Sequence, residues 1–225
     1  VKKELNSKGI KINSFTDNNR PTTNKNTFIS SGYRLLKVDT LDNTPISDDT
    51  VNSIIAKIKK TNNKILILSD FRHGIFHSNS LFKMLKSISK KTFKVGDSQV
   101  ASRWGNITEF KNFDLITPNE REARFALADQ DSTVGTLAAL LKKKSKYKNL
   151  ILKLGPRGVF CASSKNKGRV RFSVGSFSDE VLDAVGSGDA LLAYSSLVLK
   201  VTNSLVAASI IGSIAAACEC EIDGN

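Results

Sequence analysis

Cysteine and histidine are scarce in this sequence, which has three of the first and two of the second in 225 residues. Three cysteines cannot build a disulfide framework. A structural zinc ion needs four Cys or His ligands, and Cys161, Cys218, Cys220, His73 and His77 supply them poorly. The chain must therefore fold around an ordinary hydrophobic core, and we expect no metal clip.

Long hydrophobic segments are also missing. The longest mainly apolar run, residues 205–218, contains Ser209, Gly212 and Ser213 and falls short of the roughly 20 residues that cross a bilayer. It predicts a buried helix. No charged leader followed by an apolar block opens the chain. We therefore expect a cytoplasmic protein with no membrane partner.

The charge is strongly of one sign, whereas aromatic residues are few. Lys and Arg outnumber Asp and Glu by 34 to 21, which gives a net charge of +13. Such a charge permits nucleic-acid binding. The densest lysine cluster, residues 142–148, falls at the end of a helical pattern, where cations favour the helix C-terminus. Because the 7% of aromatic residues form no stacking motif, a solvated helix is preferred over a polyanion patch.

A regular alternation of helix and strand patterns fills most of the chain. Hydrophobic residues make up 40% and charged residues 24%, as in soluble globular proteins. Short apolar runs without polar alternation are typical of parallel strands buried on both faces; they occur at residues 65–68, 115–116 and 150–152, and a further strand is predicted near residues 93–95. An amphipathic helix pattern capped by Ser47 precedes the first run, and further helix patterns lie between the later ones.

This alternation predicts one α/β domain with a doubly wound, mainly parallel sheet between two layers of helices. Residues 159–162 and 170–174 are close enough in sequence to form an antiparallel hairpin across a turn at 165–168. Two apolar helices follow from Ala190, separated near residues 202–204.

The N-terminal residues 1–40 are expected to form a small β lid or edge element. Within them, residues 28–38 predict a hairpin with Gly32 at the left-handed position of its turn.

The strongest local signal is a glycine turn that opens an apolar helix. Residues 183–189 read Asp-Ala-Val-Gly-Ser-Gly-Asp. Small residues let backbone N–H groups approach a ligand, and the first turn of a helix adds unpaired donors, so the turn is a candidate anion hole. Asp189 would repel a bound phosphate unless it accepts a proton from an attacking hydroxyl. An N-capping Asp in a glycine turn is the alternative.

Two common nucleotide motifs are absent: no Gly-x-x-x-x-Gly-Lys-Ser/Thr occurs, and residues 186–188 lack the third glycine of the dinucleotide fingerprint. Residues 183–189 instead resemble the Asp-Thr-x-Gly-Ala-Gly-Asp signature of ribokinase-like (PfkB) carbohydrate kinases, with Ala184 in place of Thr and Ser187 in place of Ala.

This resemblance implies a ribokinase-like fold and phosphoryl transfer from ATP. It implies that Asp189 is the catalytic base and that the backbone of the turn holds the transferring group, which carries over to Gly186, Ser187 and Gly188. It also implies that Asp183 helps to order a loop that binds a monovalent cation such as K⁺, as in some family members.

Two further segments support the resemblance, and each follows a predicted strand. Asn119 and Glu122 are similar to the Asn-x-x-Glu motif, whose Glu orders Mg²⁺ and water around the phosphates. Lys153, Gly155 and Gly158 are similar to the nucleotide segment Thr-Leu-Gly-x-x-Gly, with Lys in place of Thr. The alternatives are a helix-capping box for the first segment and a simple strand-to-hairpin turn for the second.

The acceptor is indicated less directly. Residues 20–25, 33–39 and 69–74 resemble bacterial heptose-phosphate kinases, which implies that cations bind a sugar phosphate and that carboxylates bind sugar hydroxyls. Asp70 and Arg34 are the substrate-binding candidates, with Arg20, Lys25 and Arg72 as further cations. A solvated lid charge is the alternative for each basic residue, and a cap or turn residue is the alternative for Asp70.

The expected activity is ATP- and Mg²⁺-dependent phosphorylation of a sugar or sugar phosphate, with heptose 7-phosphate as the expected acceptor. A non-catalytic nucleotide- or sugar-phosphate-binding protein and a kinase of another sugar, such as ribose or fructose, are the alternatives. The family's N-terminal Gly-Gly-x-x-x-Asn stretch is absent, so we expect one kinase domain truncated at its N-terminus and at its C-terminus. A homodimer and a fused or separate nucleotidyltransferase domain are the expected partners.

Overall fold

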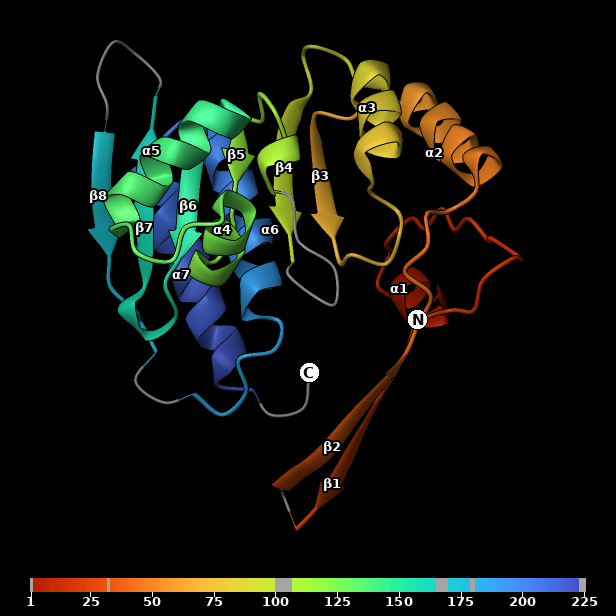
Figure 1. The fold of residues 1–225 in the computed structure, drawn as a ribbon, viewed down its shortest axis with the longest axis horizontal. Helices are drawn as coiled ribbons and strands as arrows, with labels where there is room; N and C mark the ends of the chain where they lie inside the picture. The colour runs from red at the N-terminus through yellow and green to blue at the C-terminus, as the bar shows by residue number, and fades with distance from the viewer. Residues whose placement is uncertain (1, 32, 100–106, 165–169, 179–180, 223–225) are drawn as a thin grey trace. The chain divides into compact units, whose positions relative to one another are not determined.

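The computed structural model describes residues 2–31, 33–99, 107–164, 170–178 and 181–222 (Figure 1). The chain divides into two compact units. One consists of Val1–Asn62 with His73–Ile88, and the other consists of Asn63–Arg72 with Ser89–Asn225.

The larger unit is built on a six-stranded sheet in the order β3-β4-β5-β6-β7-β8. Strands β3 to β6 pair in parallel, whereas the β6–β7 and β7–β8 pairs are antiparallel. This confirms the mainly parallel sheet and its antiparallel edge. The strands are β3 (Ile65–Asp70), β4 (Phe93–Ser98), β5 (Leu115–Ile116), β6 (Asn149–Lys153), β7 (Val159–Ser163) and β8 (Val170–Val174). The turn predicted at residues 165–168 lies outside the described residues.

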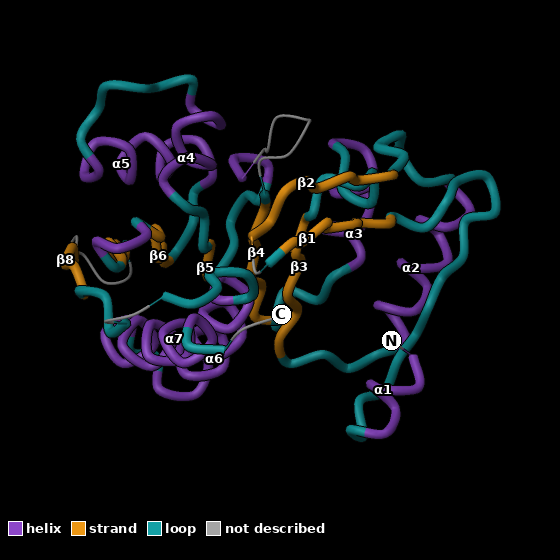
Figure 2. The backbone as a smooth tube through the Cα atoms, turned by 90° about the horizontal axis from the view of Figure 1, so that it is seen from below, coloured by secondary structure: helices purple, strands orange, loops and turns teal. Residues whose placement is uncertain are grey.

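Helices cover both faces of this sheet, as predicted. Figure 2 shows α4 and α5 on one face and α6 and α7 on the other, which gives the three-layer α/β/α arrangement. Their bounds are α4 (Glu120–Leu127), α5 (Val134–Ser145), α6 (Ser187–Thr202) and α7 (Leu205–Cys220). A core cluster joins strand residues such as Val95, Leu115 and Ile151 to Leu192 and Leu199 of α6.

Local sequence sets the ends of these helices. Thr133 and Ser204 accept hydrogen bonds from the backbone of the first turns of α5 and α7, as N-cap residues do. Ala128, Lys146 and Asn203 end α4, α5 and α6 in the left-handed conformation. Helix α6 begins directly after the glycine turn, with Gly186 as its N-cap in the left-handed conformation.

The smaller unit contains a two-stranded hairpin and a pair of helices. Its elements are α1 (Lys2–Ser7), β1 (Asn24–Ser30), β2 (Tyr33–Thr40), α2 (Asp48–Lys60) and α3 (Ser78–Ser87). Ile46, Val51 and Met84 form its core. The β1–β2 pairing confirms the predicted hairpin; Ser31 has a positive φ of 49°, whereas Gly32 lies outside the described residues.

Three short elements were not predicted from the sequence: α1, η1 (Ile107–Glu109) and η2 (Gly155–Arg157). Each is too short to show a hydrophobic period. Asp70 is the last residue of β3 rather than the residue beyond it. No helix within the described ranges is both long and apolar enough to span a membrane.

Candidate active site

Charged side chains meet at the carboxyl ends of three parallel strands. Asp97 lies near the end of β4, Thr117 follows β5 and Lys153 ends β6. The Thr117 hydroxyl donates to Asp97 Oδ1 at 2.9 Å, and Lys153 Nζ lies 3.2 Å from the same oxygen. Asp97 is buried and Lys153 is mostly so, so this ion pair is poorly screened by water. Ligands of doubly wound sheets bind at this edge.

The glycine turn lies directly beside Lys153. Gly186 is the N-cap of α6 with φ 88°, which favours glycine. A Cβ atom there would also lie 2.8 Å from Glu219 Oε1 in α7. A Cβ atom at Gly188 would lie 3.4 Å from Lys153 Nζ. The backbone donors of the helix start and the lysine ammonium therefore lie close together, as an anion-binding site would require.

Asp189 lies in the first turn of α6, and its side chain is exposed. Partial loss of solvation raises its pKa, the charge of Asp97 raises it further and Lys153 opposes the rise. A carboxylate made more basic in this way is a better proton acceptor. These electrostatic surroundings favour the general-base role predicted for Asp189.

Asp183, at the start of the same loop, is buried. Its N–H and that of Leu182 donate to the Cys220 carbonyl at 3.2 and 2.9 Å. Its Oδ1 accepts a hydrogen bond from the Val185 N–H at 3.1 Å. Asp183 thus shapes the loop that leads into the glycine turn.

Asn119 and Glu122 form the capping box that the sequence offered as an alternative. The Glu122 N–H donates to Asn119 Oδ1 at 2.7 Å, while Glu122 Oε2 and Oε1 accept from the Asn119 N–H and Nδ2 at 2.6 and 2.8 Å. Burial raises the pKa of Glu122 to about 7, with Lys153 lowering it and Asp97 raising it. Glu122 thus belongs to the charged cluster as well as to the helix cap.

The raised pKa of Glu122 predicts a pH-dependent contribution to stability. Between its ordinary value of 4.5 and about 7, the unfolded chain releases the Glu122 proton while the folded chain keeps it. Wild type should therefore lose on the order of 3 kcal/mol relative to Glu122→Gln as the pH rises through this window. Urea unfolding of both proteins in EDTA, from pH 4 to pH 8, measures this difference.

Glu120→Gln provides the control of opposite sign. In wild type the pKa of Glu120 is lowered from 4.5, first by the hydrogen bond from Arg124. The ionised Glu120 therefore stabilises the fold above pH 4.5, and this contribution is lost as the pH falls through the folded-state pKa. If the difference in unfolding free energy between wild type and Glu122→Gln stayed constant from pH 4 to pH 8, the raised pKa of Glu122 would be contradicted.

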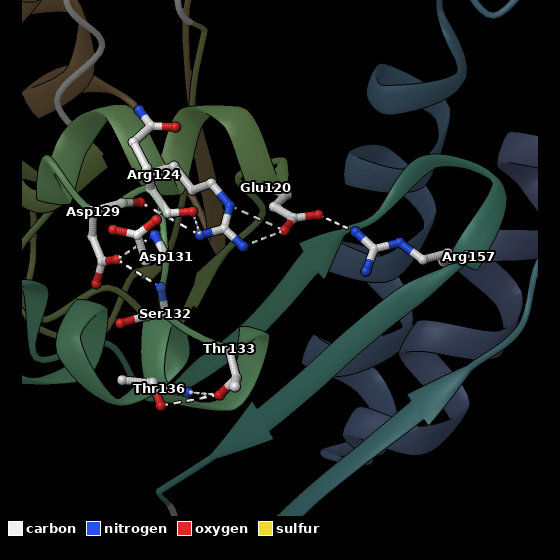
Figure 3. A network of polar contacts seen from close by, with 9 residues as sticks. Glu120, Arg124, Asp129, Asp131, Ser132, Thr133, Thr136 and Arg157 are labelled. Atoms are coloured by element: carbon white, nitrogen blue, oxygen red, sulfur yellow. Dashed lines mark hydrogen bonds and ion pairs between the residues drawn. The ribbon is translucent and has the colours of Figure 1, made fainter.

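A polar network fixes the start of α4 against the turn after β6 (Figure 3). Glu120 accepts hydrogen bonds from Arg124 Nε at 3.1 Å and from its Nη2 at 2.6 Å, and it pairs with Arg157 of η2. The Lys153 N–H also donates to the Pro118 carbonyl at 2.9 Å. These contacts hold the Asn119 and Lys153 segments together. A shallow cavity of about 410 Å³ lies beside them, lined in part by Asn119, Arg121 and Lys153.

A second cavity of about 390 Å³ opens beside the glycine turn, within the size range of small-molecule sites. It is lined by Lys153, by Ser187 and Gly188 of the glycine turn, and by Gly155 and Gly158 after β6. Gly158 has φ 76°, and a Cβ atom there would lie 2.1 Å from the Val174 carbonyl oxygen. The remaining lining residues are Pro156, Val159, Ser176–Ser178, Val181, Ala184, Leu191 and the α7 residues Ser213, Ala216, Ala217 and Cys220.

The predicted sugar-binding residues are Asp70 and Arg34. Asp70 is buried at the end of β3, next to β4, and both of its oxygens are engaged. Oδ1 accepts from the Arg72 N–H at 2.8 Å, and Oδ2 accepts from Arg72 Nη1 at 2.7 Å and from the Ser98 hydroxyl at 3.3 Å. The side chain of Arg34 lies outside the described part of the chain.

Two other candidate cations have different surroundings. The Arg20 guanidinium donates to the carbonyls of Asp42, Thr44 and His73, so it joins loops of the smaller unit. Lys25 is exposed on β1. Arg20 is therefore a structural residue in this unit rather than a free lid cation.

Asp97 is the main site residue that the sequence analysis missed. Its strand was predicted to end near Val95, whereas β4 continues to Ser98. A search of the residues following each buried run would have included Asp97. Glu219, whose carboxylate lies beside Gly186, had no comparable signal in the sequence. Its place next to the turn depends on how α7 packs.

Comparison with known proteins agrees with this geometry. A family model described as pfkB family carbohydrate kinase matches residues 1–224. The chain belongs to this family. Among curated relatives, the bifunctional protein HldE of Wolinella succinogenes is 24% identical over 197 residues, which cover 84% of this chain and 38% of that protein. HldE of Desulfatibacillum aliphaticivorans is 28% identical over 219 residues, covering 94% and 42%. This pfkB-family chain thus spans about two fifths of their length.

Solved structures of ribokinase-like kinases share its fold. Ribokinase from Giardia lamblia superposes with a TM-score of 0.74 at 16% identity, covering 99% of this chain and 72% of that one. The tetrameric inhibited form of phosphofructokinase-2 from Escherichia coli gives a TM-score of 0.68 at 19% identity, covering 84% and 61%. The chain therefore has the ribokinase-like fold predicted from its sequence.

Proposed function

We propose that this chain transfers the γ-phosphoryl group of ATP to a hydroxyl of a sugar or sugar phosphate. The observation that carries the proposal is that Lys153 Nζ lies beside Gly188 of the glycine turn. Gly188 directly precedes Asp189, whose side chain is exposed. Cation, backbone donors and base are the parts that phosphoryl transfer requires.

In this reaction the acceptor oxygen forms a bond to the γ-phosphorus while the bond to the ADP oxygen breaks. The acceptor proton passes to the Asp189 carboxylate. The N–H groups of Gly186, Ser187 and Gly188 and the ammonium of Lys153 stabilise the charge on the transferring group. Asp97 holds Lys153 in place through their ion pair.

The cavity beside the glycine turn is the proposed nucleotide site. Its lining includes Gly155 and Gly158, which have no side chains, and it reaches the proposed anion site at Ser187 and Gly188. Positive φ values of 62° and 76° favour glycine at both positions. A triphosphate at the turn would therefore place the rest of the nucleotide along α7.

Glu122 is the proposed partner of Mg²⁺, through water. No three His, Cys, Asp or Glu side chains gather as a metal-binding group in the part of the chain that the structure describes. Mg²⁺ keeps several waters and relies on substrate phosphates together with one or two carboxylates, so a single carboxylate suffices for this role. When bound, the ion would neutralise phosphate charge.

We propose further that the Asp183 loop binds a monovalent cation such as K⁺.

The proposed acceptor is heptose 7-phosphate, with reaction in the cytoplasm, where ATP is available. The support is the resemblance of residues 20–25, 33–39 and 69–74 to heptose-phosphate kinases and the similarity to several proteins named bifunctional protein HldE. The relatives' length and this name also support a nucleotidyltransferase domain as a fused or separate partner. A homodimer is the proposed assembly.

An acceptor panel tests this function. The chain is incubated with ATP and Mg²⁺ and with heptose 7-phosphate, fructose 6-phosphate or ribose, and products are identified by mass spectrometry. We expect heptose 7-phosphate to gain one phosphoryl group, with one ADP released per product. Binding of ATP without transfer to any sugar would instead support a non-catalytic nucleotide-binding protein.

A further inference from the structure

Lysines gather at the amino ends of the parallel strands of the larger unit. Strands β3 to β6 run in one direction, so their amino ends share one edge of the sheet, opposite the edge that holds Asp97 and Lys153 (Figure 1). The segments that lead into these strands contain ten lysines and two carboxylates. We call these lysines the lysine edge; they lie at positions 64, 90–94, 111 and 142–148.

Backbone hydrogen bonds hold the lysine-bearing segments side by side. The Phe93 N–H donates to the Lys64 carbonyl at 3.0 Å, and the Asp114 N–H donates to the Lys94 carbonyl at 2.8 Å. The pairing of β5 with β6 continues the row. Neighbouring strands are about 4.8 Å apart, so the four strand starts span roughly 15 Å. Adjacent starts thus lie within one Debye length at physiological salt, about 8 Å.

The charge of the lysine edge is largely uncompensated. Eight of its ten lysines are exposed, and within the described ranges only Lys148 has an ion pair, with Asp114 at 2.6 Å. The helix dipole accounts for Lys142–Lys144 in the last turn of α5, as the sequence indicated. It does not account for Lys64 or Lys111, which precede β3 and β5. Like charges held this close repel one another, which favours an anionic partner.

The residue types of the lysine edge restrict that partner. All ten cations are lysine, a compact and strongly hydrated charge, rather than arginine, whose planar fork binds phosphate with two hydrogen bonds. The aromatic side chains of these segments, such as Phe113 and Tyr147, are buried. They can neither stack on a nucleic-acid base nor anchor a protein interface, where exposed Trp, Tyr and Arg carry most of the binding energy.

The backbone at this edge also disfavours close phosphate contacts. The Ser145 carbonyl at the end of α5 accepts from the Asn112 N–H at 2.9 Å. Lys200, near the end of α6, lies 5.6 Å from the centroid of the Phe93 ring. Both helices therefore end here, and helices end in carbonyl groups. Nucleic-acid phosphates are bound in part by backbone N–H groups and helix N-termini, whereas an anionic bilayer attracts lysines without such contacts.

We infer that the lysine edge attracts this chain to an anionic lipid surface. The strand starts end at nearly one level, since Lys64 pairs with Thr92 in the register that Ile65 and Phe93 begin, and a level row of long side chains suits a planar surface. Such attraction needs no membrane-spanning helix. It also leaves the candidate active site, at the opposite edge of the sheet, facing away from the lipid. The inference therefore goes beyond the proposed function and does not depend on it.

Co-sedimentation with lipid vesicles tests the inference. The vesicles contain phosphatidylcholine and phosphatidylserine in equal parts, and vesicles of phosphatidylcholine alone serve as the neutral probe. The edge variant replaces four exposed lysines of the lysine edge: Lys90→Gln, Lys91→Gln, Lys143→Gln and Lys144→Gln. The control variant makes the same change of charge at four exposed lysines of the smaller unit: Lys2→Gln, Lys3→Gln, Lys8→Gln and Lys11→Gln.

We expect wild type to sediment with the anionic vesicles and not with the neutral ones. The edge variant should bind several hundredfold more weakly, at about fivefold for each lysine removed. The control variant should bind like wild type. Raising the salt to about 1 M, where the Debye length is about 3 Å, should release wild type. The melting temperatures of the edge variant and wild type should agree, because the substituted side chains are exposed.

Three results would overturn the inference. The first is a wild type that does not sediment with anionic vesicles. The second is an equal loss of binding in the edge and control variants, which would assign the attraction to the net charge of the chain. The third is tighter binding of wild type to a short DNA duplex than to vesicles at the same phosphate concentration, which would make a nucleic acid the partner.

Discussion

Asp189→Asn should reduce sugar phosphorylation by about 10²- to 10⁴-fold, the range that general-base catalysis contributes. Asn keeps the size and the first-turn position of the side chain but cannot accept the proton. The effect should fall on kcat. The affinity for ATP should stay the same or increase, because the substitution removes a negative charge near the phosphates. Steady-state kinetics and ATP titration of the same preparations measure both quantities.

The control for this substitution is Asp131→Asn, which changes an exposed carboxylate outside the charged cluster. It should alter neither turnover nor ATP affinity. Undiminished turnover by Asp189→Asn would disprove the role of Asp189 as base. A loss of ATP binding equal to the loss of turnover would instead make Asp189 part of a binding site.

Lys153→Met should weaken ATP binding at least tenfold and destabilise the fold. The substitution removes the ammonium beside Gly188 and leaves the buried carboxylate of Asp97 without its cation. Removing one partner of a buried ion pair typically costs about 3–5 kcal/mol. The Thr117 hydroxyl still donates to Asp97, so we expect a value at the lower end. ATP titration and urea unfolding measure the two effects.

The double substitution Asp97→Asn with Lys153→Met separates these two roles of the lysine. A neutral amide at position 97 needs no cation, so most of the lost stability should return. The affinity for ATP should stay low, because the cation at the glycine turn is still missing. If the double variant regained full ATP affinity, Lys153 would act only by balancing Asp97.

The features that could be predicted are those that depend on residues close together in the sequence. The strand and helix order followed from hydrophobic periods, and the glycine turn at 183–189 followed from residue type and spacing. The capping box of Asn119 and Glu122 was also foreseen, as an alternative to a site role; in the folded chain one carboxyl group makes the cap contacts and interacts electrostatically with Lys153 and Asp97.

Long-range features were not predictable, for physical reasons. The Asp97–Lys153 pair joins residues 56 positions apart, and only the parallel pairing of β4, β5 and β6 brings them together. Arg20 looks like a free cation in the sequence, but the fold surrounds it with carbonyl groups.

The attachment of the glycine turn to the end of α7 affects when the site can form during synthesis. Leu182 and Asp183 bond to the Cys220 carbonyl, and Glu219 packs against Gly186. Strands β3 to β6 can pair as they leave the ribosome, since chains emerge N-terminus first at about 5–20 residues per second. The turn gains these contacts only after residue 220 has emerged. A nascent chain would therefore acquire its sheet several seconds before it acquires a finished anion site.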